Sequence, residues 1–495
     1  MFLVGFCMRL VGFDYPPYDA HSLRQTQTLS TIENFHEDGI NLLRPKTIYT
    51  GYPGTFVLEF PLFQALAAVL YDVLGKHLEI VRGLNIMLGA ASAWMVFRIG
   101  RRFWNSSIGL LAAVIYWCAP LNILYQRSML IDPMAVFLAL VCFDQLAVLL
   151  LSPKHVERES CERKWPLHAG LFFIAALITA LIKALYLWPA VLLLAQQVLL
   201  RRFSLDSRVW TAIATFACAG ICFLAWNYHA MRVNNETLFT RGINPTSHLG
   251  FSALLVPEFY REFLLSRPLR WLGVIGGLLY LGGLAAAWVE RKDKAQWRSF
   301  LLIFLIPPTY IALFSDINRP HDYYQLIITP FLAMISAFGA AKCFSFAFQA
   351  LPRWIRLKCT ALAFSAALFA VASIVTYHLW MRAPKLDEPL IFFGKLVAGK
   401  FEANSPAMVF VSTKKSGYGS GWYIPQYIYA ANLWGYGRVV VDAQHARRYF
   451  DEISEAFPKL NYLVFYGMKR PDWIPESFVE KFTDDQHELF VFCRK

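Results

Sequence analysis

The residues best suited to chemistry lie close together near the start of the chain. Asp19, His21 and Arg24 fall within the stretch 15–28, although only 16% of the 495 residues are charged. A carboxylate can accept a proton from a hydroxyl group, and a histidine or arginine beside it can bind an anion. Ionisable groups next to apolar sequence are costly to keep, so we interpret this cluster as part of a functional site.

Further polar side chains interrupt apolar sequence along the chain. These candidates, each next to an apolar run, are Glu59, Arg127, Asp132, Lys183, Arg319, His321 and Tyr324. We interpret Asp19 and Asp132 as the candidate catalytic carboxylates, and the other candidates, with His21 and Arg24, as substrate-binding residues. The cations among them could stabilise negative charge on a leaving phosphate, usually the largest electrostatic contribution to catalysis.

Several of these residues also have a purely structural interpretation. Asp19 could cap the helix that follows it, and Asp132, which precedes Pro133, could cap the next span. Lys183 could extend its ammonium group to the membrane surface, and His321 could be an ordinary loop residue. These alternatives stay open on the sequence alone, because capping and catalysis are compatible roles.

The composition identifies the chain as an integral membrane protein. Hydrophobic residues make up 57% of the sequence and aromatic residues 16%, and the mean hydropathy is +0.41. Soluble chains carry about 25% charged residues, well above the value for this protein. The net charge of +13 does not indicate nucleic acid, because the basic residues fall in short loops between apolar segments.

Apolar runs long enough to span a bilayer predict a helical polytopic fold. They lie near 79–99, 106–125, 133–151, 167–186, 186–200, 209–228, 268–289, 299–315, 324–344 and 358–380. The basic loops between them, for example Arg98–Arg102 and Lys154–Lys164, should face the cytoplasm. This orientation is consistent if residues 56–74 lie in the interface, kinked at Pro61, rather than crossing it. Together with the first helix, residues 1–380 then form a membrane domain of about 11 transmembrane helices, with the candidate residues on its outer face.

The two ends of the chain depart from this pattern. Only about ten residues, with Arg9 among them, precede Gly12, whereas a span needs about 20. We therefore expect either that the natural chain starts further upstream or that the first helix is truncated. Toward the C-terminus, strand-like runs alternate with helix-like stretches. The strand-like runs are 407–412, 439–441, 462–466 and 489–492. Residues 381–495 are therefore expected to form a small α/β domain outside the cytoplasm, on the same side as the first outer loop, 14–78.

Four strings of this sequence resemble the GT-C superfamily of membrane glycosyltransferases. They are "DAHSLRQTQTLSTIENFHEDGINLLRP", "LEFPLFQALAAVLYDVLG", "QRSMLIDPMAVFL" and "NRPHDYYQLIITP". Their order is similar to that in bacterial family-39-like members, which include protein O-mannosyltransferases, lipid A aminoarabinose transferases and lipopolysaccharide-core galacturonosyltransferases. The resemblance covers about residues 9–345.

The resemblance implies a hexosyl- or pentosyltransferase with a polyprenyl-phosphate sugar donor, a lipid, glycan or protein acceptor, and inversion at the anomeric carbon. The acidic residue that opens the first outer loop in such enzymes maps to Asp19, and Asp14 is an alternative without the His-x-x-Arg-Gln continuation. Many relatives carry a second acidic residue where this chain has Ala20. The implied location is the inner (plasma) membrane, with the active site and the C-terminal domain extracytoplasmic. No cofactor is certain, and a divalent metal is compatible with the chemistry but has no ligand signature.

Other functions remain open on the sequence alone. A transporter or flippase of lipid-linked sugars would share the composition, but it should carry polar or broken helices at mid-membrane. A structural or assembly protein would not need the candidate residues. Gly417–Tyr423 is either a flexible turn or a sugar-contacting loop. The sequence favours glycosyl transfer, because its ionisable groups are expected at one membrane surface; it does not identify the sugar or the acceptor.

Overall fold

The computed structural model describes residues 2–48, 54–151, 165–201, 206–236, 240–241, 250–350, 387–416, 420, 424–454 and 460–495. The chain folds into two compact units that alternate along the sequence. The first contains Met1–Phe13, Glu79–Asn227 and Pro245–Ala383, and the second contains Asp14–Leu78, Tyr228–Asn244 and Pro384–Lys495. The loop 14–78 thus groups with the C-terminal residues, while the domain division after residue 380 stays a prediction.

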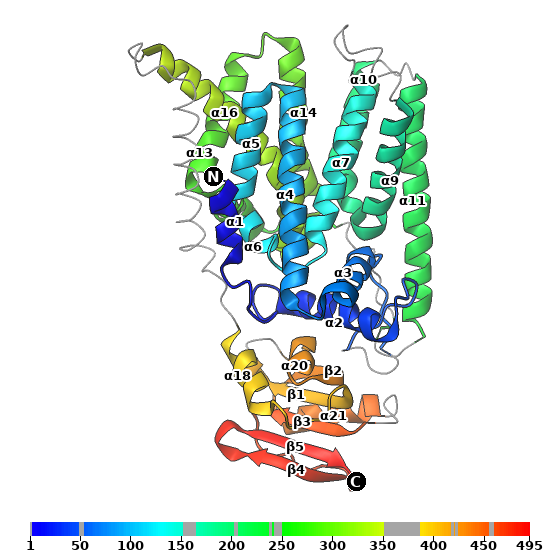
Figure 1. Ribbon diagram of the computed structural model, residues 1–495. Helices are drawn as coiled ribbons and strands as arrows, with labels where there is room; N and C mark the ends of the chain where they lie inside the picture. Colours follow the sequence, from blue (N-terminus) through cyan, green and yellow to red (C-terminus); the bar gives the residue numbers. More distant parts are fainter. Residues whose placement is uncertain are drawn as a thin grey trace. The chain divides into compact units, whose positions relative to one another are not determined.

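The first unit is a bundle in which long helices run side by side (Figure 1). Its helices are α1 (Phe2–Leu10), α4 (Leu78–Phe103), α5 (Ser106–Cys118), α6 (Pro120–Tyr125), α7 (Asp132–Leu150), α9 (Trp165–Lys183), α10 (Trp188–Leu200), α11 (Ser207–Asn234), α12 (Pro257–Arg261), α13 (Arg267–Val289), α14 (Lys294–Leu313), α15 (Ser315–Asn318) and α16 (Thr329–Ala350). The last residues of α11 and the first residue of α4 are assigned to the second unit.

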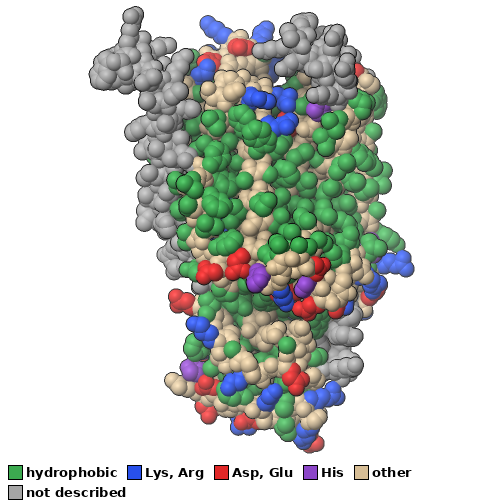
Figure 2. Space-filling model, viewed as in Figure 1, with side chains coloured by type: hydrophobic (Ala, Val, Ile, Leu, Met, Phe, Trp, Pro, Cys, Tyr) green, Lys and Arg blue, Asp and Glu red, His purple; other side chains and the backbone are tan. Residues whose placement is uncertain are grey.

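Length and composition of these helices match a membrane protein. Within the described ranges, six helical stretches are long and apolar enough to cross a bilayer: Leu78–Phe103, Asp132–Leu150, Trp165–Leu200, Ser207–Asn234, Pro257–Val289 and Asp322–Cys343. Large apolar side chains such as Met87, Trp94 and Ile221 are exposed on the bundle, and Figure 2 shows hydrophobic side chains covering its visible face. Lipid solvates such a surface, so the predicted polytopic membrane fold is confirmed. The predicted number of spans stays a prediction, and the run 358–380 lies outside the described residues.

Short 3₁₀ segments replace regular α-helix at two places in the predicted spans, next to polar residues. The predicted spans 167–186 and 186–200 meet at the 3₁₀ turn Ala184–Leu187, which follows Lys183, whose backbone has φ −155° and ψ 84°. Helix α10 then restarts at Trp188, with proline in its first turn, where the missing N–H costs nothing. A second 3₁₀ segment, Asp322–Ile328, precedes α16. These breaks let polar side chains leave the regular helix surface without losing an entire span.

Helices α13 and α16 approach closely at two glycines. A Cβ atom on Gly339 would lie 2.1 Å from the carbonyl oxygen of Leu279 and 2.4 Å from the nitrogen of Gly283. Helices in lipid associate through such close backbone packing, because hydrocarbon gives them no hydrophobic driving force. The two helices therefore pack at backbone distance in the first unit.

The second unit contains a five-stranded sheet with the order β2-β1-β3-β5-β4. The strands are β1 (Ser405–Ser412), β2 (Leu433–Val440), β3 (Tyr462–Tyr466), β4 (Phe478–Asp484) and β5 (Leu489–Arg494). Strands β2, β1 and β3 pair in parallel. Strand β5 pairs antiparallel to β3, and β4 pairs antiparallel to β5. The predicted small α/β domain is confirmed. The predicted run 439–441 covers only the end of β2, and β4 was missed, because this largely exposed edge strand has no apolar run. The stretch Gly417–Tyr423, apart from Ser420, lies outside the described residues.

Helices cover both faces of this sheet. Helices α18 (Glu388–Val397) and α20 (Pro425–Ala430) pack on one face, and α21 (Ala443–Ile453) packs on the other. Helices α2 (Ser22–Asp38) and α3 (Leu62–Leu74) belong to the same unit, and α2 contacts both α3 and α20. Helix α3 begins directly after its N-cap residue Pro61, so the kink predicted within 56–74 is instead a helix start.

A charged network holds α2, α3 and α20 together. The Tyr429 hydroxyl donates to Glu33 Oε1 at 2.9 Å. Lys76 Nζ lies 3.5 Å from the same oxygen and 3.0 Å from Glu37 Oε1. Burial raises the pKa of the Glu33 carboxyl above its ordinary value of 4.5, and the Lys76 ammonium opposes that shift. Because the folded state holds this proton more tightly than the unfolded chain, the stability from Glu33 is lost as pH rises through the folded-state pKa.

We expect Glu33→Gln to remove this part of the pH dependence. Glutamine keeps an oxygen for the Tyr429 hydroxyl but cannot ionise, so the melting temperature of the variant should fall less than that of wild type as pH rises above 4.5. Circular dichroism melts of the detergent-purified protein measure this slope. Glu37→Gln is the matched control, since Glu37 pairs with the same lysine. A wild-type slope in Glu33→Gln would contradict the assignment.

Candidate active site

A buried lysine–aspartate pair lies among the polar residues of the first unit. Lys183 Nζ is 2.5 Å from Asp132 Oδ1, and each side chain is only 2% exposed. The Tyr186 hydroxyl donates to the same carboxylate oxygen at 2.8 Å. The ring centroids of Tyr324 and Tyr323 lie 3.7 Å and 4.9 Å from the ammonium nitrogen, so the cation also faces aromatic rings. We call these five residues the lysine cluster.

The lysine cluster joins elements that are distant in sequence. Asp132 begins α7, Lys183 ends α9, and the tyrosines come from the two 3₁₀ segments. The Tyr310 hydroxyl of α14 donates to the Tyr324 carbonyl oxygen at 3.0 Å. The N-cap of α7 is Ile131, with no side-chain cap, so the capping interpretation of Asp132 is wrong. The interpretation that Lys183 reaches the membrane surface is also wrong, because its ammonium is buried against Asp132.

A second polar group, the arginine cluster, contains Glu262, Arg267, Arg270, Arg319 and Asp322. Arg270 Nη1 and Arg267 Nη1 lie 3.2 Å and 3.6 Å from Asp322 Oδ2. Arg319 Nε lies 3.8 Å from Glu262 Oε1, and its carbonyl oxygen accepts a 2.7 Å hydrogen bond from Arg267 Nη2. Three guanidinium groups against two carboxylates leave a net charge of +1, which suits an anionic ligand.

The segment 319–324 supplies residues to both clusters. His321 lies between Arg319 and the tyrosines, with its ring centroid 5.4 Å from that of Tyr323. Sequence reasoning found this segment but missed Arg267, Arg270 and Glu262 on the other side of the arginine cluster. The sequence does contain a signal for them. Arg267 and Arg270 lie at the start of the run 268–289, although a basic loop already follows its other end, and basic residues at both ends of a span depart from the usual distribution.

Arg127 has a different environment from the other cations. Its fully buried guanidinium donates from Nη1 to the carbonyl oxygens of Val11 at 3.0 Å and Gly12 at 3.3 Å. Its own carbonyl oxygen accepts a 3.1 Å hydrogen bond from Arg82. Arg127 therefore ties the segment after α1 to the bundle, and a role in substrate binding stays a prediction.

The second unit holds Asp19 in a nearly buried position. Its side chain is 5% exposed, and Gln25 Nε2 donates both to its Oδ1 and, at 2.8 Å, to the carbonyl oxygen of Ala20. The N-cap of α2 is His21, in a left-handed conformation with φ 56°. Asp19 lies two residues before this N-cap and pairs with Gln25, so the interpretation of Asp19 as the helix cap is wrong.

Arg24 and Glu59 extend this group, which we call the Asp19 cluster. Arg24 Nη2 lies 2.6 Å from Glu59 Oε1, and Arg24 Nη1 donates to Gln27 Oε1 at 2.7 Å. Burial, assisted by Glu33, raises the pKa of the Tyr18 phenol, which keeps this neighbour of Asp19 neutral. The sequence did not predict that Arg24 and Glu59 lie close together across the loop; only the fold shows this pair.

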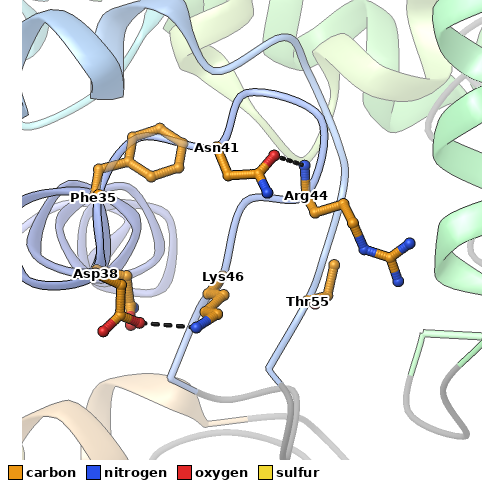
Figure 3. A pocket seen from close by; sticks show the side chains of 8 residues that line it. Phe35, Asp38, Asn41, Arg44, Lys46 and Thr55 are labelled. Atoms are coloured by element: carbon orange, nitrogen blue, oxygen red, sulfur yellow. Dashed lines mark hydrogen bonds and ion pairs between the residues drawn. The ribbon is translucent and has the colours of Figure 1, made fainter.

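Figure 3 shows a polar pocket in the second unit, with a volume of about 200 Å³. Phe35 and Asp38 come from α2, and the loop after it contributes Asn41, Arg44 and Lys46. Lys46 Nζ lies 2.8 Å from Asp38 Oδ2, and the Arg44 backbone N–H donates to Asn41 Oδ1 at 3.1 Å. An aromatic ring beside amide, carboxylate and cationic groups suits a ligand rich in hydroxyl groups. Sequence reasoning did not single out this pocket.

The predicted site residues thus fall into two sets. The first unit brings together Asp132, Lys183, Arg319, His321 and Tyr324, with Arg127 buried elsewhere. The second unit brings together Asp19, His21, Arg24 and Glu59, with Asp19 and Arg24 each anchored by a glutamine. Across the residues that the structure describes, no group of three or more histidine, cysteine or acidic side chains has the geometry to hold a metal ion.

No protein-family model matches the chain, and no curated protein matches it in sequence. Its fold, in contrast, is shared with solved membrane proteins. The structure of ArnT from Cupriavidus metallidurans bound to undecaprenyl phosphate matches with a TM-score of 0.65 at 12% sequence identity. The match covers 99% of this chain and 97% of ArnT.

Two further structures support the same fold. The Archaeoglobus fulgidus oligosaccharyltransferase in its apo form matches with a TM-score of 0.51 at 12% identity, over 94% of this chain and 68% of that one. The mycobacterial arabinofuranosyltransferase AftD matches with a TM-score of 0.52 at 13% identity, over 99% of this chain and 39% of AftD. All three are GT-C membrane glycosyltransferases, so the chain has the GT-C fold that its sequence strings resemble.

The lysine cluster leads to a prediction about stability. Removing one member of a buried ion pair leaves an uncompensated charge, so Lys183→Met and Asp132→Asn should each destabilise the protein by about 3–5 kcal/mol. The double variant should recover part of this loss, because neither charge remains buried. Thermal unfolding of the purified variants measures the effect. Lys76→Met is the control, since this lysine pairs with Glu33 and Glu37 but is 44% exposed. Purely additive single losses in the double variant would contradict the pairing.

Proposed function

We propose that this protein is a membrane glycosyltransferase of the inner (plasma) membrane. It moves a hexosyl or pentosyl group from a polyprenyl-phosphate donor to a hydroxyl group of an envelope lipid, glycan or protein, outside the cytoplasm. The observation that carries the proposal is the match over almost the whole length of both chains to ArnT, which was solved with undecaprenyl phosphate bound. The lysine, arginine and Asp19 clusters, each built from segments distant in sequence, support a catalytic rather than a purely structural protein.

Asp19 is the proposed general base. The acceptor oxygen attacks the anomeric carbon, the bond from that carbon to the phosphate oxygen breaks, and Asp19 takes the acceptor proton. One such displacement inverts the anomeric centre and releases the polyprenyl phosphate as an anion. The Gln25 amide donates to Oδ1 of Asp19 and so orients the carboxylate that would accept the proton. Arg24, paired with Glu59 beside it, is a proposed substrate-binding residue.

The arginine cluster is the proposed binding site for the donor phosphate. Its net charge of +1 opposes the charge that develops on the leaving oxygen, and Arg270 is 41% exposed, so its remaining N–H groups can reach a ligand. Asp132 and Lys183 neutralise each other, and we assign them the role of positioning residues that hold the 319–324 segment through Tyr323 and Tyr324.

The second unit is the proposed acceptor-binding part of the protein. Its polar pocket carries carboxylate, amide and cationic groups beside Phe35, a set that can bind the hydroxyl groups of a sugar or a polar lipid head. Neither the sugar that is transferred nor the acceptor is identified by these side chains. A divalent metal would need ligands from a substrate or from other parts of the chain, given the side-chain geometry of the described residues.

The proposal predicts that Asp19→Asn lowers kcat by about 10²–10⁴-fold, because the variant cannot accept the acceptor proton. Transfer of labelled sugar from a polyprenyl-phosphate donor to an envelope extract, by protein in proteoliposomes, measures the rate. Asp72→Asn is the control, since this exposed carboxylate of the same unit pairs with His36 at 2.5 Å and should keep wild-type kcat. Wild-type turnover in Asp19→Asn would remove Asp19 as the base, whereas lipid translocation without any glycosylated product would favour a flippase.

A further inference from the structure

The polar pocket of the second unit is small and combines a buried end with a charged rim. Its volume of about 200 Å³ is below the roughly 300–1,000 Å³ of pockets for drug-sized ligands, so it suits a ligand the size of a single sugar ring. Phe35 and Thr55, which are 3% and 6% exposed, line its buried end. The side chains of Asp38 and Lys46 on the rim are 53% and 42% exposed, so the rim is open to a ligand from solution (Figure 3).

The sequence builds this pocket at the end of α2. Gly39 terminates the helix with φ 90°, a conformation that favours glycine, and the chain then turns back. Lys46 and Thr55 pair as an antiparallel bridge, and the Thr47 N–H donates to the Gly54 carbonyl oxygen at 2.7 Å. The helix end and the bridge therefore hold the lining side chains on separate backbone segments.

Every charged side chain that lines the pocket has an opposite charge beside it. Lys46 pairs with Asp38 at 2.8 Å, and Arg44 pairs with Glu236 through both of its terminal nitrogens. These two cations and two carboxylates sum to zero, so the charge of the pocket does not favour an ionic ligand.

Neutral hydrogen-bonding groups remain open in the pocket. The Asn34 amide nitrogen donates to the Ser30 carbonyl oxygen at 2.6 Å, and the Asn41 amide oxygen accepts from the Arg44 N–H. In the part of the chain that the structure describes, the Asn34 oxygen, the Asn41 nitrogen and the Thr55 hydroxyl carry no hydrogen bond. An acceptor, a donor and a hydroxyl beside an aromatic ring match a neutral sugar, whose hydroxyl groups form hydrogen bonds and whose C–H groups pack on the ring.

The pocket lies at some distance from the Asp19 cluster within the same unit. Phe35 follows Arg24 by 11 residues on α2, about three turns, so both face the same side of the helix, roughly 16 Å apart. Thr55 precedes Glu59, the partner of Arg24, by four residues, which span at most about 14 Å. The helix thus separates the pocket from the Asp19 cluster by more than one sugar ring, and the short loop keeps both within reach of one chain of sugars.

We propose that the polar pocket is a remote subsite for a neutral sugar of the acceptor, so that the acceptor is an envelope glycan or glycolipid with several linked sugars. The inference rests on the proposed function and narrows its acceptor class, since a lone protein hydroxyl or a simple lipid head would leave the pocket empty. The pocket does not touch the reacting atoms. It holds a distant ring and thereby lowers the acceptor concentration that the enzyme needs.

The test removes one hydroxyl group and keeps the shape of the pocket. Thr55→Val is the main variant. Thr483→Val in β4 is the matched control, because the Thr483 hydroxyl also lacks a hydrogen bond to any described residue and lies outside the pocket. Asn41→Ala, on the exposed rim, serves if Thr55→Val does not fold. Binding to the full chain in nanodiscs, which carry no sugar head groups, is measured by saturation-transfer-difference NMR titration with mannose, galactose, N-acetylglucosamine, glucuronate and inorganic phosphate.

We expect at least one neutral sugar to bind wild type more tightly than glucuronate and phosphate do. Thr55→Val should weaken this binding about three- to tenfold, because one hydrogen bond is lost. Thr483→Val should bind like wild type. Tighter binding of glucuronate or phosphate than of every neutral sugar, or sugar binding that does not depend on Thr55, would overturn the proposal.

Transfer kinetics test the role of the pocket as a subsite. The acceptors are an envelope glycolipid extract and the same extract after glycosidases have trimmed its outer sugars. Thr55→Val should raise KM about three- to tenfold for the intact extract, leave kcat within about twofold, and change neither constant for the trimmed extract. A fall in kcat for both extracts would indicate a structural effect on the Asp19 cluster and would contradict the subsite.

The subsite and the proposed function fail in different ways. Sugar binding that depends on Thr55, in a protein that forms no glycosylated product, would keep the pocket as a carbohydrate site and remove the transferase. Transfer with the same KM in Thr55→Val and wild type, for both extracts, would keep the transferase and remove the subsite.

Discussion

The buried pair of Lys183 and Asp132 is the interaction on which the arrangement of the first unit depends. A charge removed from water and lipid head groups must meet an opposite charge at short range, and this requirement fixes the ends of α7 and α9 against each other. The same ammonium faces the rings of Tyr323 and Tyr324, so it also fixes the segment before α16. That segment carries Arg319 and His321, and their position follows from the pair.

Charge is balanced differently in the arginine cluster and in the lysine cluster, and the different roles proposed for the two clusters rest on this difference. The lysine cluster is neutral and closed, whereas the arginine cluster keeps one positive charge in excess and a half-exposed Arg270. The neutral, buried lysine cluster thus lies beside a charged and partly exposed one, and the two share the segment 319–324.

The second unit shows why a loop near the N-terminus can act with a domain near the C-terminus. The Tyr18 carbonyl oxygen accepts a 2.7 Å hydrogen bond from the Asp387 N–H, and the Gly435 N–H donates to the Ile48 carbonyl oxygen at 2.7 Å. With the Glu33 network, these contacts make the Asp19 cluster, the polar pocket and the sheet parts of one unit. A change in the C-terminal residues can therefore alter the surroundings of Asp19 without touching it.

Composition and periodicity by themselves determined the membrane class, most of the helical segments and the small α/β domain. The functional roles of the segments around Asp19, Asp132 and Arg319 stay predictions. Apolar runs and basic loops are local properties, so one sequence suffices to find them. The pairing of Lys183 with Asp132, the partners Arg267 and Arg270, and the grouping of 14–78 with the sheet were decided only by the tertiary structure. These features depend on which distant segments meet and how buried charge is neutralised, and no short stretch of sequence contains that information.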